Sequence, residues 1–353
     1  MSQLNVDTIK KADGTGNLSV PAETGTVVTT ASPSLGRRNI ILNGSMAVAQ
    51  RGGSAVTSDT SYPVDRFFVL NNTSTGTFSA QQVSESSDGF KNSLKVTVTA
   101  ADTDLANAER LLVNYYVEGN DFVAPAFGTS SAQNITLSFQ VRSSLTGTFS
   151  GSVQNSAQNR SFPFEYTINS ADTWETKSVT ITGDTTGTWL TDTGVGLRLR
   201  FSLGCGSVQK GTVNTWASAN YFGTSAETSL IGTNGATWYI TGVQLEVGSV
   251  ATSFEHRSYG EELALCQRYY EKAEVNFRHF TTASGQYLRP YLQFATTKRA
   301  EPNITGTLAT ELNMTYQASN DQISPESVGL DFRSTGVSAN AFAYYNFTFD
   351  AEL

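Results

Sequence analysis

The sequence predicts a mainly β protein: a jelly-roll-like β-sandwich with a single connector helix and a small C-terminal β domain. Composition, the period of the apolar residues and one helix-start signal carry this prediction. Serine and threonine make up about a quarter of the 353 residues, and there are 30 glycines. Threonine and aromatic side chains suit pleated sheets, while glycine and serine suit turns. Charged residues are 15% and aromatic residues 11% of the chain, which excludes disorder for most of its length.

The charge balance and the cysteine count exclude several classes of protein. The net charge is −8, whereas a surface that follows nucleic-acid phosphates needs positive charge. No apolar run approaches the roughly 18 residues of a membrane span, and the first residues carry no apolar signal core. We therefore expect no nucleic-acid partner and no membrane insertion. Cys205 and Cys266 are too few for a disulfide framework, which fits synthesis in a reducing cytoplasm.

The first 38 residues differ from the rest and predict an N-terminal attachment arm over 1–38. Two short strand-like pieces, LNVDTIKK and GTVVTT, are separated by turn signals. Such pieces cannot bury enough surface alone. The alternative is a floppy tail, but apolar residues recur too often for a solvated linker. We expect the arm to become ordered against sister chains or a larger assembly through Leu4, Val6 and Ile9.

From residue 39 to 255 the apolar residues alternate with polar ones in many short runs. SLKVTVTA, NITLSFQVRS, SFPFEYTI and GVGLRLRFSLG each place every second apolar residue on one face. Glycine, asparagine, aspartate and serine separate the runs. This period of two indicates half-buried antiparallel strands. Two sheets packed face to face satisfy the pattern, which predicts a sandwich over 39–255.

One helix stands out within 256–275. Ser258 and Glu261 form a capping box, in which the serine caps the helix and the glutamate follows three residues later. Four residues follow at spacings of four, three and four, so they share one helical face. Because the domain that follows the helix is small, we expect this region to pack around a threefold axis. These predicted trimer contacts are Tyr259, Leu263, Cys266 and Tyr270. Strand-like runs then return over 276–353, a C-terminal β domain somewhat small to stand alone.

Several blocks resemble a bacteriophage tail-fibre family, and the likeness extends over essentially the whole chain from residue 37. The longest block, at 238–272, is the most specific. Phe67 departs from the tryptophan expected after Asp-Arg, and 290–299 matches loosely. The blocks are RRNIILNGSMAVAQRG (37–52), YPVDRF (62–67), WETKSVTITGDTTGTW (174–189), GVGLRLRFSLG (194–204), WYITGVQLEVGSVATSFEHRSYGEELALCQRYYEK (238–272) and the terminal FDAEL.

The resemblance implies a phage virion structural protein with a carbohydrate-binding-module-like sandwich, usually assembled as a homotrimer. Its expected place is the phage tail, where it presents a binding surface to host polysaccharide. One alternative is an adaptor or decoration subunit that binds only other virion proteins. Another is a glycan depolymerase, an enzyme that needs two carboxylates facing each other about 5 to 10 Å apart.

Catalytic and metal motifs are scarce, so we expect no enzyme, no cofactor and no metal. The two histidines, His256 and His279, read as hydrogen-bonded structural residues. No G-x-S-x-G, HExxH or CxxC motif occurs. Asp102, Asp104 and Glu109 could hold calcium in a loop, but a solvated turn is the preferred interpretation.

Sugar binding has more support, because sugar faces stack on aromatic rings. Trp174 and Trp238 adjoin strand starts and read as packing residues. Trp189 and Trp216 lie among threonine, asparagine and glycine, which leaves exposure and burial equally open. Tyr221 lies close to the second of them. The predicted glycan-binding residues are Trp189, Trp216 and Tyr221.

Overall fold

The computed structural model describes residues 9–10, 17–18, 37–52, 54–318 and 321–353. Contacts divide the chain into two units, Met1–Arg38 and Asn39–Leu353. In the first unit, β1 (Ile9–Lys10) pairs antiparallel with β2 (Asn17–Leu18), with Ile9 opposite Leu18. Leu4 and Val6, two of the predicted attachment residues, lie outside the described residues.

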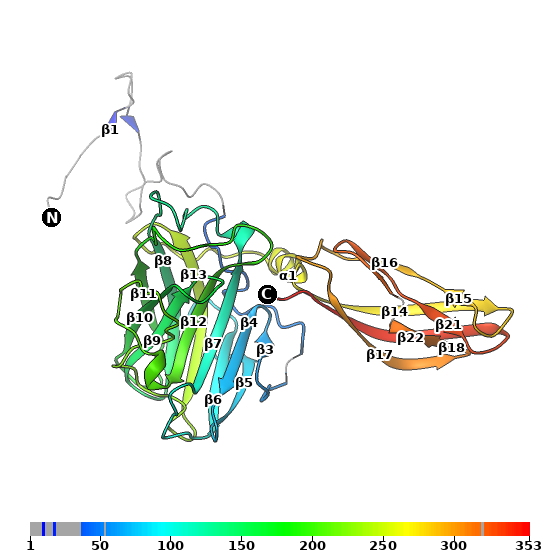
Figure 1. Ribbon diagram of the computed structural model, residues 1–353, viewed down its shortest axis with the longest axis horizontal. Coiled ribbons are helices and arrows are strands. Elements are labelled where there is room, and N and C mark those ends of the chain that lie inside the picture. Colours follow the sequence, from blue (N-terminus) through cyan, green and yellow to red (C-terminus); the bar gives the residue numbers. More distant parts are fainter. Residues whose placement is uncertain (1–8, 11–16, 19–36, 53, 319–320) are drawn as a thin grey trace. The chain divides into compact units, whose positions relative to one another are not determined.

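The second unit begins with a sandwich of two antiparallel sheets, so the predicted fold class is confirmed (Figure 1). In spatial order the six-stranded sheet contains β10 (Ser161–Ile168), β9 (Gly147–Gln154), β12 (Val195–Cys205), β7 (Arg110–Glu118), β4 (Phe67–Asn72) and β3 (Ser61–Val64). The five-stranded sheet contains β11 (Glu175–Ile181), β8 (Ile135–Ser143), β13 (Thr237–Val247), β6 (Ser93–Ala100) and β5 (Thr77–Val83).

The apolar residues that alternate along the strands point inward and fill the space between the two sheets. In β12 the side chains of Leu197, Leu199 and Phe201 belong to one large core cluster. Trp238 is fully buried in the same core, and its indole N–H donates to the Tyr166 hydroxyl at 3.2 Å. Successive strand residues point to opposite faces. Arg198, Arg200 and Ser202 therefore point away from the core, onto the outer face of the six-stranded sheet.

Two short 3₁₀ helices and one α-helix interrupt the strands among the described residues. They are η1 (Gly119–Asp121), η2 (Ser207–Gln209) and α1 (Tyr259–Gln267). Ser258 caps α1 as predicted, because its hydroxyl accepts the backbone N–H of Glu261 at 3.3 Å. None of the helices in the described ranges is long and apolar enough to cross a membrane.

The helix is shorter than the sequence pattern predicted, so the four residues predicted to share one helical face do not all belong to the helix. It ends at Gln267, and Tyr270 is already the first residue of β14 (Tyr270–Thr281). Tyr270 pairs there with Asp350, a long-range contact that helical spacing cannot reveal. Helical structure thus occupies 259–267, and strand begins before residue 276.

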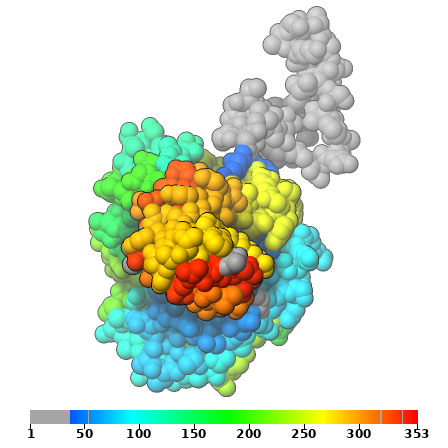
Figure 2. All heavy atoms as spheres, turned by 90° about the vertical axis from the view of Figure 1, so that its right-hand side faces the viewer, coloured from blue at the N-terminus to red at the C-terminus, as the bar shows by residue number. Residues whose placement is uncertain are grey.

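The C-terminal part contains three small sheets of three strands each. Figure 1 shows their strands in yellow to red, and Figure 2 shows the atoms of this part in the same colours. The longest sheet is β14, β22 (Ser338–Asp350) and β17 (Asn303–Leu312). The others are β15 (Tyr287–Leu288), β21 (Phe332–Ser334) and β18 (Met314–Tyr316), and β16 (Tyr291–Gln293), β20 (Ser327–Gly329) and β19 (Gln322–Ile323). Phe332, Phe347 and Phe349 lie in a core cluster of their own, separate from that of the sandwich.

Candidate functional site

The segment from residue 206 to 228 crosses the outer face of the six-stranded sheet and forms a hollow of about 600 Å³. Tyr221, Lys210 and Glu165 bring an aromatic ring, an ammonium and a carboxylate to its wall. The other lining residues are mostly small or hydroxyl-bearing: Gly211, Thr212, Val213, Thr215, Ala217, Thr224 and Ser225. A ring surrounded by hydrogen-bonding groups is the chemistry that binds a sugar, whose apolar face stacks while its hydroxyls bond.

Backbone hydrogen bonds hold this segment to β9 and β10. Ser161 and Ala217 exchange N–H···O bonds at 3.0 and 2.9 Å. The side-chain amide of Gln154 donates to the carbonyl of Tyr221 at 2.6 Å. A Cβ at position 211 would approach the Tyr221 ring to 2.4 Å, so Gly211 is required for the ring to take this position. The Tyr221 ring is therefore fixed by its surroundings before a ligand arrives.

The two predicted tryptophans lie together beside this hollow and do not line it. Trp189 is 8% exposed and packs on Phe127 and Trp216, at ring separations of 4.9 and 5.6 Å. Trp216 is half-buried, and its indole N–H donates to the Thr182 carbonyl at 2.7 Å. The structure thus buries Trp189 in the core and leaves Tyr221 in the hollow. Trp238 is a core residue, whereas Trp174 is half-buried and lies 6.1 Å from the Tyr239 ring.

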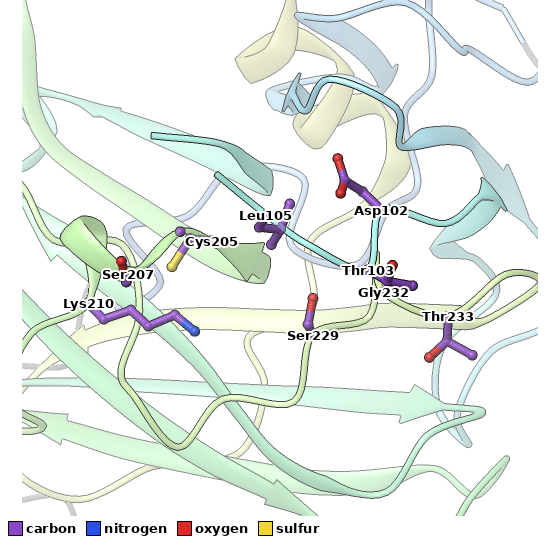
Figure 3. Close-up of a pocket in the computed structure, with 10 residues that line it drawn as sticks. Asp102, Thr103, Leu105, Cys205, Ser207, Lys210, Ser229, Gly232 and Thr233 are labelled. Carbon is purple, nitrogen blue, oxygen red and sulfur yellow. The ribbon is translucent and has the colours of Figure 1, made fainter. Parts of the chain in front are cut away.

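A second hollow of about 470 Å³ shares Lys210 with the first (Figure 3). Figure 3 shows Lys210 and Cys205 on one side and Asp102 and Thr233 on the other. Its polar lining includes Ser207, Ser229 and Thr103 as well. The Lys210 ammonium lies 3.5 Å from the Glu227 carboxylate, so its charge is balanced within the chain. Burial and the nearby Glu227 raise the pKa of the Cys205 thiol, which keeps it protonated and unreactive.

A third hollow of about 590 Å³ lies on the C-terminal sheet of β14, β22 and β17. Lys272 and Glu274 of β14 line it next to their cross-strand partners Thr348 and Asn346 of β22, with Thr307 of β17 beside them. It offers charged and polar groups, and its aromatic lining residue is Phe347, a buried core side chain.

Among the described residues, no cluster of three or more His, Cys, Asp and Glu side chains could hold a metal ion. Tyr259 is 60% exposed, Leu263 is half-buried, and Cys266 is fully buried within its own chain. Tyr270 is also buried, in β14. Of the predicted trimer contacts, Tyr259 alone offers a largely exposed side chain.

Sequence reasoning missed Glu165 and Lys210, and also the two outward arginines of β12. The alternation in GLRLRF was a usable signal, because it places Arg198 and Arg200 opposite a run of core leucines. Nothing local could place Glu165 next to Lys210 and Tyr221. The segment 206–228 folds back over β10, and that contact is long-range.

Comparisons with known proteins find distant structural likeness and no sequence family. No protein-family model matches the chain, and no curated protein matches it. The enzymatically active domain of bacteriophage CBA120 tailspike protein 4 matches with 9% identity and a TM-score of 0.33, over 59% of this chain and 21% of that one. The chain thus corresponds to about a fifth of that tailspike domain.

Two carbohydrate-binding modules match at a similar level. A family 4 module has 13% identity and a TM-score of 0.30, over 58% of this chain and 97% of the module. The family 11 module from Clostridium thermocellum, solved with a β-1,3-1,4-mixed-linked tetrasaccharide, has 11% identity and a TM-score of 0.29. That match covers 57% of this chain and 99% of the module. These likenesses are too distant to assign a ligand to this chain.

Proposed function

We propose that this protein is a phage tail-fibre or related virion structural protein that binds a glycan of the host surface. The hollow around Tyr221 is the main support for the proposal, because it combines an aromatic ring that is already held in position with hydroxyl groups, Glu165 and Lys210. The sequence blocks that resemble tail fibres supply the virion context. The tail of the phage is the proposed location, and other tail proteins are the proposed partners of the arm over 1–38.

Binding without turnover is the proposed chemistry at this hollow. A glycoside hydrolase of the usual kind needs two carboxyl groups on either side of the scissile bond. Glu165 is the one carboxylate among the described residues that line the hollow. Glu227 lies nearby, but its oxygens accept from Ser150 and from the backbone N–H of Cys205, and its side chain is fully buried. This arrangement supports a binding site over a depolymerase.

We propose a homotrimer as the assembled state, as the family resemblance implies. Exposed apolar side chains are frequent in the C-terminal part, where Phe280, Leu308 and Leu312 are 56%, 49% and 46% exposed. Such groups favour burial against other chains. Light scattering of the full chain at micromolar concentration should give three times the monomer mass. A monomer at that concentration contradicts the proposal.

Binding to purified bacterial surface polysaccharides tests the role of the hollow. We expect Tyr221→Ala to weaken binding about fivefold or more, with an unchanged melting temperature. Trp174→Ala is the matched control. It also removes a half-buried aromatic ring, but Trp174 lies directly before β11 of the five-stranded sheet and away from the hollow. The length of the polysaccharide should stay constant during incubation, and release of reducing ends would establish the depolymerase instead.

A variant on the C-terminal sheets separates two possible binding surfaces. Tyr291 is 64% exposed and lies in β16, away from the hollow. Loss of binding with Tyr291→Ala, while Tyr221→Ala binds normally, would move the glycan site to the C-terminal part and contradict the site proposed here.

A further inference from the structure

The outer face of the six-stranded sheet carries two arginines in neighbouring cross-strand rows. In one row Arg198 of β12 lies between Gln154 of β9 and Tyr116 of β7. In the next row Arg200 lies between Ser152 and Asn114. Residues two apart on a strand share a face, so the two guanidinium groups occupy the same side of the sheet.

Arg200 is a buried cation whose charge is not balanced by a carboxylate. Its side chain is 2% exposed, and its Nη2 donates to Gln158 Oε1 at 3.1 Å and to the Tyr116 hydroxyl at 3.4 Å. None of the ion pairs formed within the described ranges involves Arg200 or Arg198. The protein as a whole carries a net charge of −8, so this face is a local exception.

Other cations surround Arg200 instead. The guanidinium groups of Arg200 and Arg110 both contact the Phe222 ring, at 4.8 and 5.1 Å from its centre. Burial lowers the pKa of Arg200 to about 10; Tyr116 opposes this shift, and Arg198 and Arg110 add to it. A buried charge without a partner is costly, and an anion placed here would remove that cost.

The polar atoms left over on this face include donors and acceptors. Arg198 Nε, Arg200 Nε and Ser152 Oγ are buried and make no hydrogen bond to any described residue. Asn114 Oδ1 and Gln154 Oε1 are buried acceptors in the same condition. The Gln154 amide is oriented by its Nε2, which donates to Asn220 Oδ1 and to the Tyr221 carbonyl. An oxyanion satisfies the donors, and hydroxyl groups satisfy the acceptors.

We propose that this face binds an acidic sugar residue, one that carries a carboxylate, phosphate or sulfate next to free hydroxyls. Arg198 and Arg200 hold the oxyanion, and Asn114 and Gln154 accept from the hydroxyls. The proposal rests on the proposed function, because it names the class of glycan that the sandwich recognises. A neutral sugar would leave the charge of Arg200 buried and unbalanced.

Access to Arg200 runs past Arg198 and two loop side chains. Arg198 is half-buried, and its guanidinium lies 4.2 Å from the Tyr116 ring. Gln158, on the β9–β10 hairpin, and the exposed Asn220 meet above the arginines at 3.5 Å. A hydrogen bond of this length is at the weak limit, so little is lost when the two side chains separate.

Titration with small probes at constant ionic strength tests the site. The probes are sodium glucuronate, inorganic phosphate and glucose, the last as the uncharged counterpart of glucuronate. We expect saturable binding of glucuronate or phosphate, and at least tenfold weaker binding of glucose. If phosphate alone binds, the recognised sugar carries phosphate rather than carboxylate. If neither anion binds saturably, or glucose binds as well as glucuronate, the proposal is overturned.

Three arginine variants assign the effect to this face. Arg200→Met and Arg198→Gln should each weaken anion binding about tenfold or more. Arg200→Met should keep the wild-type melting temperature, because replacing an unbalanced buried charge by an apolar side chain of similar length is neutral or stabilising. Arg142, half-buried on the other sheet and paired with Glu85, is the matched control, and Arg142→Gln should bind like wild type. Equal anion binding by all three variants overturns the proposal.

These experiments distinguish a failure of the acidic-sugar site from a failure of the proposed host-glycan binding. Host polysaccharide that binds wild type and Arg200→Met equally, with Tyr221→Ala impaired, contradicts the acidic-sugar site alone. Glucuronate that binds through Arg198 and Arg200, while no bacterial polysaccharide binds, supports the anion site and contradicts host-glycan binding.

Discussion

Arg66 and Glu352 form an ion pair between residues that are 286 positions apart in the sequence. Arg66 lies directly before β4 of the sandwich, and Glu352 is the penultimate residue. The Arg66 side chain is 2% exposed, and its guanidinium lies 3.5 Å from the centre of the Tyr269 ring. Burial lowers the pKa of Arg66, but Glu352 together with the neighbouring tyrosine hydroxyls outweighs burial and raises the pKa above its ordinary value. The C-terminal residues are therefore fastened to the sandwich beside the end of α1.

Glu352→Gln should destabilise the protein strongly, because it leaves the buried Arg66 without its counter-charge. Breaking a buried pair on one side costs about 3–5 kcal/mol. Asp350→Asn is the control, since Asp350 pairs with Arg51 at 3.1 Å but is 41% exposed. An exposed pair contributes about 0–1 kcal/mol. Urea denaturation measures both changes, and equal effects of the two variants would contradict this explanation.

Three of the blocks that resemble tail fibres, 37–52, 238–272 and the terminal FDAEL, contribute residues to this same junction. Asn43 of the NGSM block donates to the carbonyls of Val48 and Asp65, both at 2.8 Å. Its backbone N–H donates to Glu262, a buried residue of α1. Arg51 donates to Glu352 at 3.3 Å. These blocks therefore report how the sandwich, the helix and the last strand are joined, and they say little about a ligand.

Acid should weaken the junction through Glu118. This carboxylate accepts two bonds from Arg268, at 2.7 and 2.9 Å, and one from the Tyr269 hydroxyl at 2.7 Å. Burial alone would raise the pKa of Glu118, but these hydrogen bonds outweigh it and hold the pKa below the usual 4.5. The stabilisation is complete above the unfolded-state pKa and is lost as the pH falls through the lower folded-state pKa.

The measurement is the free energy of unfolding at several pH values between about 6 and about 3. As the pH is lowered, Glu118 takes up a proton in the unfolded state at a higher pH than in the folded state. The free energy of unfolding should therefore decrease more steeply in wild type than in Glu118→Gln as the pH is lowered. Parallel pH profiles for the two proteins would show that Glu118 contributes nothing to the acid sensitivity.

The sandwich was predictable because each strand carries its own alternation. Leu197, Leu199 and Phe201 identify the core face of β12 from the sequence of this strand alone. The end of α1 was not predictable in the same way. Cys266 and Tyr270 fit helical spacing, but Tyr270 pairs with Asp350 and is therefore the first residue of β14. A long-range partner decided the boundary, and no local pattern contains that information.

The candidate site was predictable in part, and Trp189 shows the physical reason. Threonines and glycines around it resemble an exposed loop, but Phe122 and Phe127 of one distant loop and Trp216 of another enclose its ring. Tyr221 comes from a similar context and does line a hollow. Local composition describes the loop, whereas exposure depends on which distant rings reach it.

Truncating the two tryptophans should separate them by stability. Trp189→Ala removes a ring that is 8% exposed and belongs to the main core, so it should cost about 3–5 kcal/mol. Trp216→Ala should cost less, because the ring is half-buried at the edge of that core. Thermal and urea unfolding compare them. A larger loss for Trp216→Ala would show that the assigned burial is reversed.

A buried ion pair fixes the C-terminal sheets to the end of α1. The side chain of Lys298 is 0% exposed, and its ammonium contacts the Glu271 carboxylate at 2.5 Å. It also donates to the carbonyls of Gln267, the last residue of α1, and Thr296, at 2.6 and 3.2 Å. Burial lowers the pKa of Lys298, and Glu271 opposes that shift.

A double-mutant cycle on this pair should be strongly non-additive. Lys298→Met alone leaves the Glu271 carboxylate unbalanced, and Glu271→Gln alone leaves the buried ammonium unbalanced, so each should cost about 3–5 kcal/mol. The double variant removes both charges and should cost much less than the sum, because neither partner remains charged without the other. Urea denaturation of the four proteins gives the coupling free energy. Additive losses would mean that the two side chains stabilise the junction independently, through packing rather than through their charges.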